Sequence, residues 1–144
     1  MHEFPHRYLA AATGRPATSI ETSSPGLANI EANTPPEFDG PGGLWSPETM
    51  LTGAVANCLI LTWRSIASFN SVEWLDIKVA AVGVLDRVER VTRFTEFQLK
   101  VTLTVPAGSE TEKVEKLMHK AEAACLVTNS LNAEINLELE LLNP

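Results

Sequence analysis

The sequence contains two cysteines, Cys58 and Cys125, which are its residues best suited to covalent chemistry. Cys58 lies in the middle of a long apolar segment, and Cys125 lies near the end of a second segment that carries an apolar stripe. Two inward thiols on different elements can meet in a folded chain. A thiolate that attacks a peroxide oxygen becomes a sulfenic acid, and a second thiol converts this acid to a disulfide. The two cysteines therefore suit a redox pair.

The alternative is that both cysteines are small core residues, because free cysteine is among the most buried residue types. The residues alone leave both interpretations open. A metal site is less favoured, since no Cys-x-x-Cys motif occurs and the histidines lack ligand spacing with either cysteine. These histidines are His2, His6 and His119. We therefore expect no bound metal.

A reactive thiol in a buried helix needs a nearby cation, because apolar surroundings raise the pKa of a thiol. Arg7, Arg15 and Arg64 are the candidates, and Arg15 lies on a predicted turn that can fold over a site. A carboxylate would hold the guanidinium group in place, and Glu48 at the start of the long helix is the natural partner. The sequence leaves the choice of arginine open.

Glu48 and Cys58 are ten residues apart on one predicted helix, a separation of about 15 Å. A glutamate cannot reach that far, so either an arginine spans the gap or Glu48 comes from a second chain. The small residues Gly53, Ala54 and Ala56 favour close approach of another helix. This spacing predicts a homodimer with its sites at the interface.

The long helix is expected over Ser46–Phe69. Ser46 can accept from the free N–H groups of the first turn, Pro47 suits the first helical position, and Glu48 suits the positive end of the helix dipole. Its apolar residues cover nearly every face, which is typical of a buried helix. The apolar span Met50–Trp63 is shorter than the about 20 residues that a membrane needs. One stripe recurs at three and four residues: Leu51, Ala54, Val55, Cys58, Leu61, Thr62 and Ser65.

The remaining elements are predicted from alternation, periodicity and turn residues. Short strands are expected at residues 6–12, 17–22 and 27–33, an irregular loop at 34–44, long strands at 74–88 and 94–105, and a last strand at 134–142. A second helix is expected from Ser109, as its cap, to Leu126, followed by a short helical turn starting at Thr128 or Ser130. The order predicts one α+β domain over residues 1–144 with mainly antiparallel sheet.

Composition limits the classes of partner. The net charge of −7 argues against nucleic acid and against anionic membrane surfaces. The N-terminal residues show no basic run followed by an apolar segment, so we expect a cytoplasmic protein with reduced thiols. A small neutral substrate or another protein is favoured as the partner.

The segment SPETMLTGAVANC resembles the OsmC/Ohr family of osmotically inducible and organic hydroperoxide resistance proteins, in which Pro-Glu opens a long helix and cysteine follows ten residues after the glutamate. KAEAACLVTNSL resembles the second cysteine segment of that family. The opening FPHRY and the loop PPEFDGPGGLWSPE look most like a less studied OsmC-like branch. The resemblance implies an intertwined homodimer, with sheets from both chains wrapped around two central helices.

The resemblance also implies a thiol-dependent peroxidase that reduces organic, often lipid, hydroperoxides in oxidative stress defence. Cys58 would be the peroxidatic cysteine, Cys125 the resolving cysteine, and Glu48 the carboxylate that holds Arg15. The expected reductant is an external dithiol, such as lipoyl groups on a carrier protein, with no bound cofactor. The chain departs from the family where Pro16 follows Arg15 and where Leu126 follows Cys125 in place of a common proline.

Two other functions are compatible with the residues. A hot-dog thioesterase also wraps a sheet around a long helix and would use Glu48 as a base, but the helix predicted before the last strand argues against it. A non-enzymatic dimer would hold a hydrophobic ligand in an apolar cavity with both thiols inert.

Overall fold

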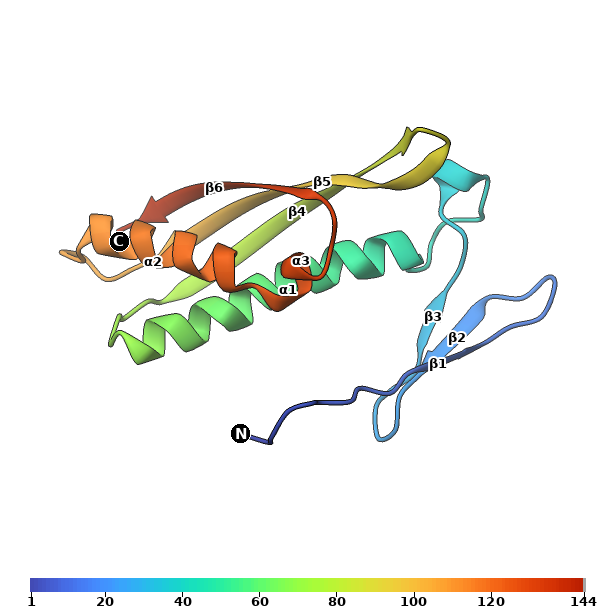
Figure 1. Ribbon diagram of the computed structural model, residues 1–144, viewed down its shortest axis with the longest axis horizontal. Coiled ribbons are helices and arrows are strands. Elements are labelled where there is room, and N and C mark those ends of the chain that lie inside the picture. The colour runs from blue at the N-terminus through green and yellow to red at the C-terminus, as the bar shows by residue number, and fades with distance from the viewer. Residues whose placement is uncertain (144) are drawn as a thin grey trace. The chain divides into compact units, whose positions relative to one another are not determined.

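The computed structural model describes residues 1–143 and divides the chain into two compact units, Met1–Met50 and the chain from Leu51 onward (Figure 1). Each unit contains its own three-stranded sheet. The α+β class is confirmed by these two sheets together with the long helix. Because the chain forms two compact units, the single domain over residues 1–144 stays a prediction.

The first unit holds an antiparallel meander of short strands. β1 (Ala11–Thr13), β2 (Ile20–Ser23) and β3 (Ile30–Ala32) pair in chain order, and the 3-10 helix η1 (Pro36–Phe38) follows in the expected loop. The strands are shorter than predicted, and the prediction for residues 6–12 is largely wrong because β1 begins only at Ala11. All three residues of β1 are exposed, so no buried face extends the pairing.

The long helix α1 (Pro47–Phe69) has the predicted bounds and cap. The Thr49 backbone N–H donates to Ser46 Oγ at 3.1 Å, and the Ser46 N–H donates in return to Thr49 Oγ1 at 2.9 Å. This reciprocal pair satisfies N–H groups that have no partner within the helix. Ser46 is buried, so the cap is held firmly in place.

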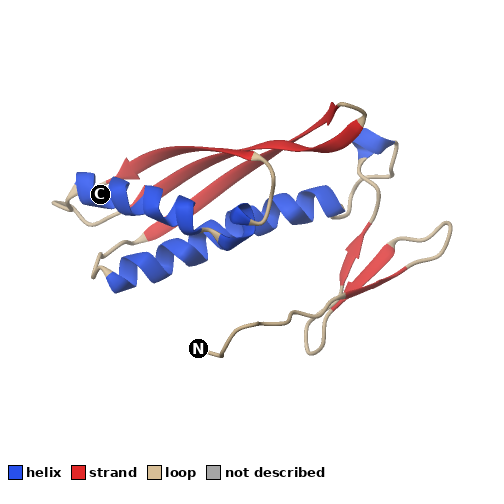
Figure 2. Cartoon of the chain, viewed as in Figure 1, coloured by secondary structure: helices blue, strands red, loops and turns tan. Residues whose placement is uncertain are grey.

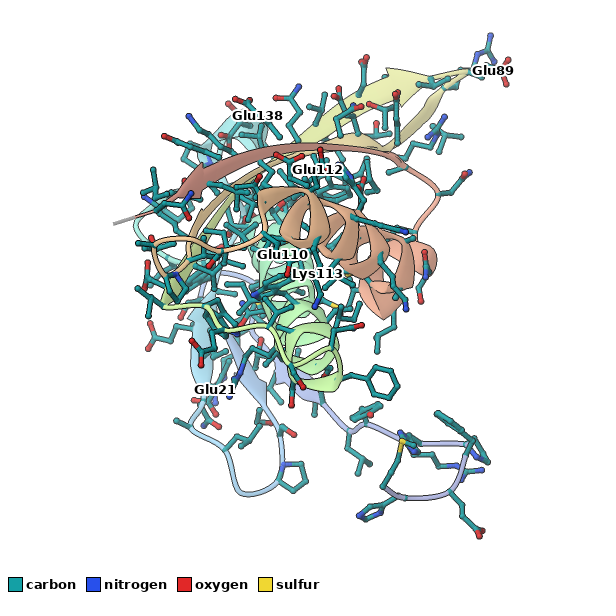
Figure 3. All side chains as sticks on the ribbon, turned by 90° about the vertical axis from the view of Figure 1, so that its left-hand side faces the viewer. Glu21, Glu89, Glu110, Glu112, Lys113 and Glu138 are labelled. Carbon is teal, nitrogen blue, oxygen red and sulfur yellow. The ribbon has the colours of Figure 1, made fainter. Side chains whose placement is uncertain are left out.

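The sheet of the second unit has the order β4 (Asp76–Val88), β5 (Val91–Thr104) and β6 (Glu134–Leu142). β4 and β5 form an antiparallel hairpin with a two-residue turn, Glu89–Arg90, in which both residues have positive φ. Glu89 lies at the tip of this hairpin (Figure 3). β6 pairs with β5 in parallel, because the helices between them return the chain to the same end of the sheet.

The inner face of this sheet is built from aligned apolar rows. Cross-strand partners place similar side chains side by side, in the rows Ile77–Leu103–Leu141, Val79–Val101–Leu139 and Ala81–Leu99–Leu137. The predicted alternation of β5 and β6 is thereby confirmed. On the other face, Glu138 points away from the helices (Figure 3).

Two helices pack against this inner face (Figure 1). α1 contributes Val55, Leu59, Trp63 and Ala67, which recur at every fourth residue, and α2 (Thr111–Ala124) contributes Val114, Leu117, Met118 and Ala121. The prediction that Ser109 caps α2 is wrong, since Glu110 occupies that position. The Ser109 hydroxyl instead donates to the carbonyl of Pro106 at 2.6 Å and closes the preceding turn.

The helix α3 (Leu126–Asn129) follows α2 after a break at Cys125 (Figure 2). It confirms the expected short helical turn but begins earlier than Thr128. The physical reason is that Cys125 has extended backbone angles and serves as both the end of α2 and the start of α3.

The sequence predicts that α1 is buried on nearly every face. Within a single chain only one face is buried, since five of its 23 residues are buried. Leu61 and Phe69 are exposed on its other sides. Among residues 1–143, α1 is also the one helix long and apolar enough to cross a membrane, a test that the core helix of a soluble protein also passes. The open side of α1 therefore leaves these two large apolar side chains exposed among polar residues.

Gly83 provides a test of how closely α1 approaches β4. A Cβ atom there would lie 2.6 Å from Thr52 Oγ1, 2.9 Å from Phe94 Cε1 and 3.0 Å from Phe97 Cε1. We expect Gly83→Ala to lower the free energy of unfolding by about 1–3 kcal/mol through overpacking, measured by urea denaturation. Val82→Ile, on an exposed neighbour, should change it by less than about 0.5 kcal/mol. Equal stability of Gly83→Ala and wild type would contradict this packing.

Candidate functional site

Cys58 lies on α1 between its core face and its open side. Its side chain is 8% exposed, and it lines a pocket on the surface of the second unit. Its sulfur lies 4.0 Å from the hydroxyl oxygen of Thr62, one helical turn further along. The thiol is thus mostly buried but accessible from the pocket.

Cys125 lies at the break between α2 and α3 and is 1% exposed. Both cysteines are free thiols, and the Cys58 thiol lies close enough to Cys125 to help raise the pKa of the Cys125 thiol. Two residues that are 67 positions apart in the sequence are therefore neighbours in the fold. Cys58 lines the pocket, whereas Cys125 does not.

The environment of Cys125 disfavours its charged form. Burial raises the pKa of the Cys125 thiol above its ordinary value, and the neighbouring Cys58 thiol adds to the increase. The backbone and the hydroxyl of nearby Thr128 act in the opposite direction and offset part of this increase. Cys125 is therefore held as a neutral thiol at neutral pH.

The pocket beside Cys58 has a volume of about 760 Å³ and is mainly apolar. Its walls come from the open side of α1 and from the α2–α3 junction, which lie close together in Figure 2. Neither lysine nor arginine lines it within the described residues. The lining residues are Ala54, Asn57, Cys58, Leu61, Thr62, Ser65, Ile66, Ala124, Leu126 and Val127.

The other predicted site residues lie in three parts of the chain: α1, the turn between β1 and β2, and the N-terminal segment. Glu48 is half-buried in the first turn of α1, ten residues before Cys58 as the sequence indicates. Arg15 is exposed in the turn between β1 and β2, and Arg7 is exposed near the N-terminus. Arg64 is exposed on α1, but the six residues that separate it from Cys58 direct it about 120° away around the helix. The roles of Glu48 and Arg15 stay predictions.

Sequence reasoning missed the two threonines beside the thiols. Thr62 follows Cys58 by four residues, and Thr128 follows Cys125 by three, so each lies one helical turn away. This spacing is the signal that would have found them. Within residues 1–143, no group of three or more His, Cys, Asp or Glu side chains lies close enough to hold a metal.

Comparison with known proteins identifies the family. The model of the family described as OsmC-like protein matches residues 40–140, which include Glu48, Cys58 and Cys125. This chain belongs to the OsmC-like protein family. The match begins after Arg15, so it does not include the predicted arginine.

Relatives of this OsmC-like protein agree with the assignment. It is 25% identical to the uncharacterized protein YmaD of Bacillus subtilis, over 94% of this chain and 92% of YmaD. It is 29% identical to peroxiredoxin OsmC of Escherichia coli, over 72% of this chain and 71% of that protein. A solved OsmC-like protein of unknown function from Vibrio cholerae has a TM-score of 0.86 at 21% identity, covering 94% of this chain and all of that one. The fold is thus OsmC-like, not that of a hot-dog thioesterase.

The environment of Cys125 leads to a prediction about pH. In Cys58→Ser, burial still acts on Cys125, so alkylation by iodoacetamide should rise with pH around a midpoint above the ordinary thiol value of about 8.5. Because the folded pKa is raised, the free energy of unfolding should fall as pH rises from the ordinary thiol pKa toward the raised one. The urea-unfolded variant, alkylated in parallel, should show the ordinary midpoint. A native midpoint at or below that value would contradict the environment described here.

Proposed function

We propose that this OsmC-like protein is a thiol-dependent peroxidase that reduces organic hydroperoxides. The Cys58 thiolate attacks the terminal oxygen of the hydroperoxide, which forms a sulfur–oxygen bond, breaks the oxygen–oxygen bond and releases an alcohol. The Cys58 sulfenic acid then condenses with the Cys125 thiol, which gives a disulfide and one water molecule. Two thiols are oxidised and one hydroperoxide is reduced in each cycle.

One observation carries this proposal: the two cysteine thiols lie near each other beside an apolar pocket that Cys58 lines and Cys125 does not. The accessible thiol is suited to react first, and the shielded thiol behind it is suited to resolve the sulfenic acid. The raised pKa of Cys125 agrees with this order, because a neutral thiol is a poor competitor for the peroxide.

The pocket supports an organic substrate. Its lining is mainly apolar, and Leu61, Ile66 and Leu126 can contact the organic part of a hydroperoxide. Hydrogen peroxide has no such part and would gain little from these contacts. The name peroxiredoxin OsmC, which the Escherichia coli relative carries, supports the same reaction class.

The complete site is proposed to form in a homodimer. The open side of α1 exposes apolar residues that a second copy would cover, and the small residues Gly53, Ala54 and Ala56 permit close approach of a second helix. In that assembly, Arg15 lies over Cys58 and favours its thiolate, and Glu48 holds the Arg15 guanidinium group.

The cycle needs an external reductant, because the two thiols give two electrons to the peroxide and end as a disulfide, which must regain two electrons. We propose a dithiol for this role, such as lipoyl groups on a carrier protein, with no cofactor bound by the chain itself. The proposed setting is the cytoplasm under oxidative stress, where a reducing environment regenerates thiols.

The apolar pocket also favours a second candidate function, a dimer that binds a hydrophobic ligand without catalysis. In that case the pocket would hold its ligand against unreactive thiols. The rate at which peroxide oxidises the reduced protein separates the two functions.

The main test is stopped-flow oxidation of the reduced protein by cumene hydroperoxide and by hydrogen peroxide, followed by mass analysis. We expect faster oxidation by cumene hydroperoxide and a product lighter by two hydrogens, with Cys58 joined to Cys125. Cys58→Ser should lose turnover, and Cys125→Ser should stop at a sulfenic acid that dimedone traps. Undiminished turnover in Cys58→Ser would overturn the proposal, and slow oxidation of wild type by both peroxides would favour ligand binding.

The role of Arg15 is tested by Arg15→Ala. A nearby cation lowers a thiol pKa by one or more units, so its loss should slow oxidation of Cys58 at neutral pH by about tenfold or more. Arg7→Ala is the matched control, because it removes the same charge from another exposed position of the first unit. If Arg15→Ala leaves the oxidation rate of Cys58 unchanged and Arg7→Ala slows it, then Arg7 and not Arg15 is the arginine that favours the thiolate.

A further inference from the structure

Thr62 contributes a hydroxyl group to the pocket lining close to the Cys58 sulfur. Its hydroxyl oxygen lies 4.0 Å from that sulfur, and both residues line the pocket. Asn57 also lines the pocket, but its side-chain N–H donates to the carbonyl of Gly53 at 2.8 Å. Ser65 is two helical turns, about 10 Å, beyond Cys58. A molecule that reaches the sulfur therefore meets the Thr62 hydroxyl beside mainly apolar walls.

The direction of the hydroxyl proton decides what Thr62 can do. Thr62 Oγ1 donates to the carbonyl oxygen of Cys58 at 2.7 Å, a short hydrogen bond within the helix. Its proton is thus occupied, and its lone pairs remain available on the sulfur side. In this geometry Thr62 is a hydrogen-bond acceptor for a group that lies against the sulfur.

We propose that Thr62 positions the hydroperoxide by accepting a hydrogen bond from its O–H group. This inference rests on the proposed peroxidase function. The O–H group belongs to the terminal oxygen of the peroxide, which is the oxygen that the thiolate attacks. A hydrogen bond to Thr62 holds this oxygen against the Cys58 sulfur and directs the organic part of the molecule toward the apolar walls.

The hydrogen bond can persist through the reaction. The sulfur–oxygen bond forms while the oxygen–oxygen bond breaks, and the electron pair leaves with the alkoxide, which takes a proton from solvent. The terminal oxygen keeps its hydrogen and becomes the hydroxyl of the sulfenic acid. Thr62 can therefore hold the sulfenic acid as well, until the Cys125 thiol displaces its oxygen as water.

The proposal separates reactions of Cys58 that need an O–H group from those that do not. In the Cys125→Ser background, where Cys58 is the remaining thiol, Thr62→Val removes the hydroxyl and keeps the shape of the side chain. We expect it to slow oxidation by cumene hydroperoxide by about tenfold, the effect of one hydrogen bond in the transition state. Alkylation by iodoacetamide, which has no O–H group, should keep both its rate and its pH profile.

Two further variants in the same background act as controls. Thr62→Ser keeps the hydroxyl and should restore most of the oxidation rate. Ser68→Ala removes a hydroxyl from an exposed position of α1 outside the pocket and should leave oxidation unchanged. Circular dichroism of all variants checks that the helix is retained.

The outcomes distinguish this inference from the proposed function. Unchanged oxidation in Thr62→Val, with a reactive Cys58, would overturn the role of Thr62 and leave the peroxidase intact. Equal slowing of oxidation and alkylation would also overturn it, because Thr62 would then act on the thiol and not on the peroxide. If neither peroxide oxidises the Cys125→Ser protein with Thr62 intact, the proposed peroxidase function is refuted, and the role of Thr62 is refuted with it.

Discussion

The packing of α1 on the inner face of β5 is the contact on which the thiol pair depends. Val55, Leu59, Trp63 and Ala67 recur at every fourth residue and are buried against the apolar rows of the sheet. This contact fixes the rotation of α1 about its axis. Cys58, adjacent to Leu59, is thereby held at the border between the core and the open side of the helix. A rotation by one residue would carry its thiol about 100° away from this border.

The second constraint is the break between α2 and α3. α2 is anchored to the sheet by its apolar stripe, and its last turn ends at Cys125 in an extended conformation. The Thr128 hydroxyl donates to the carbonyl of Cys125 at 3.1 Å, which stabilises the start of α3. Leu126 follows without a proline, and its exposed side chain forms part of the pocket wall. The residue that departs from the family pattern thus contributes to the apolar surface beside Cys58.

The two thiols differ in burial and in access from the pocket. Burial raises the pKa of the Cys125 thiol, and this thiol lies near Cys58, as the proposed resolving step requires. Cys58 is accessible from the pocket, so a molecule that enters it can approach the Cys58 sulfur along apolar walls. In the proposed reaction this difference in exposure fixes the order in which the cysteines act.

The sequence by itself determined the local elements and the face on which each cysteine lies. Ser46, Pro47 and Glu48 marked the start of α1, and strict alternation marked the inner faces of β5 and β6, because such signals depend on neighbouring residues alone. Only the tertiary structure decided the contact between Cys58 and Cys125, the pocket beside them and the position of Thr62 at its sulfur. The bounds of β1 to β3 were misplaced because these strands are short and mostly exposed, although the ranges predicted for β2 and β3 overlap the observed strands. The parallel pairing of β6 depends on how the intervening helices return the chain. These features come from packing between distant segments, which no local pattern records.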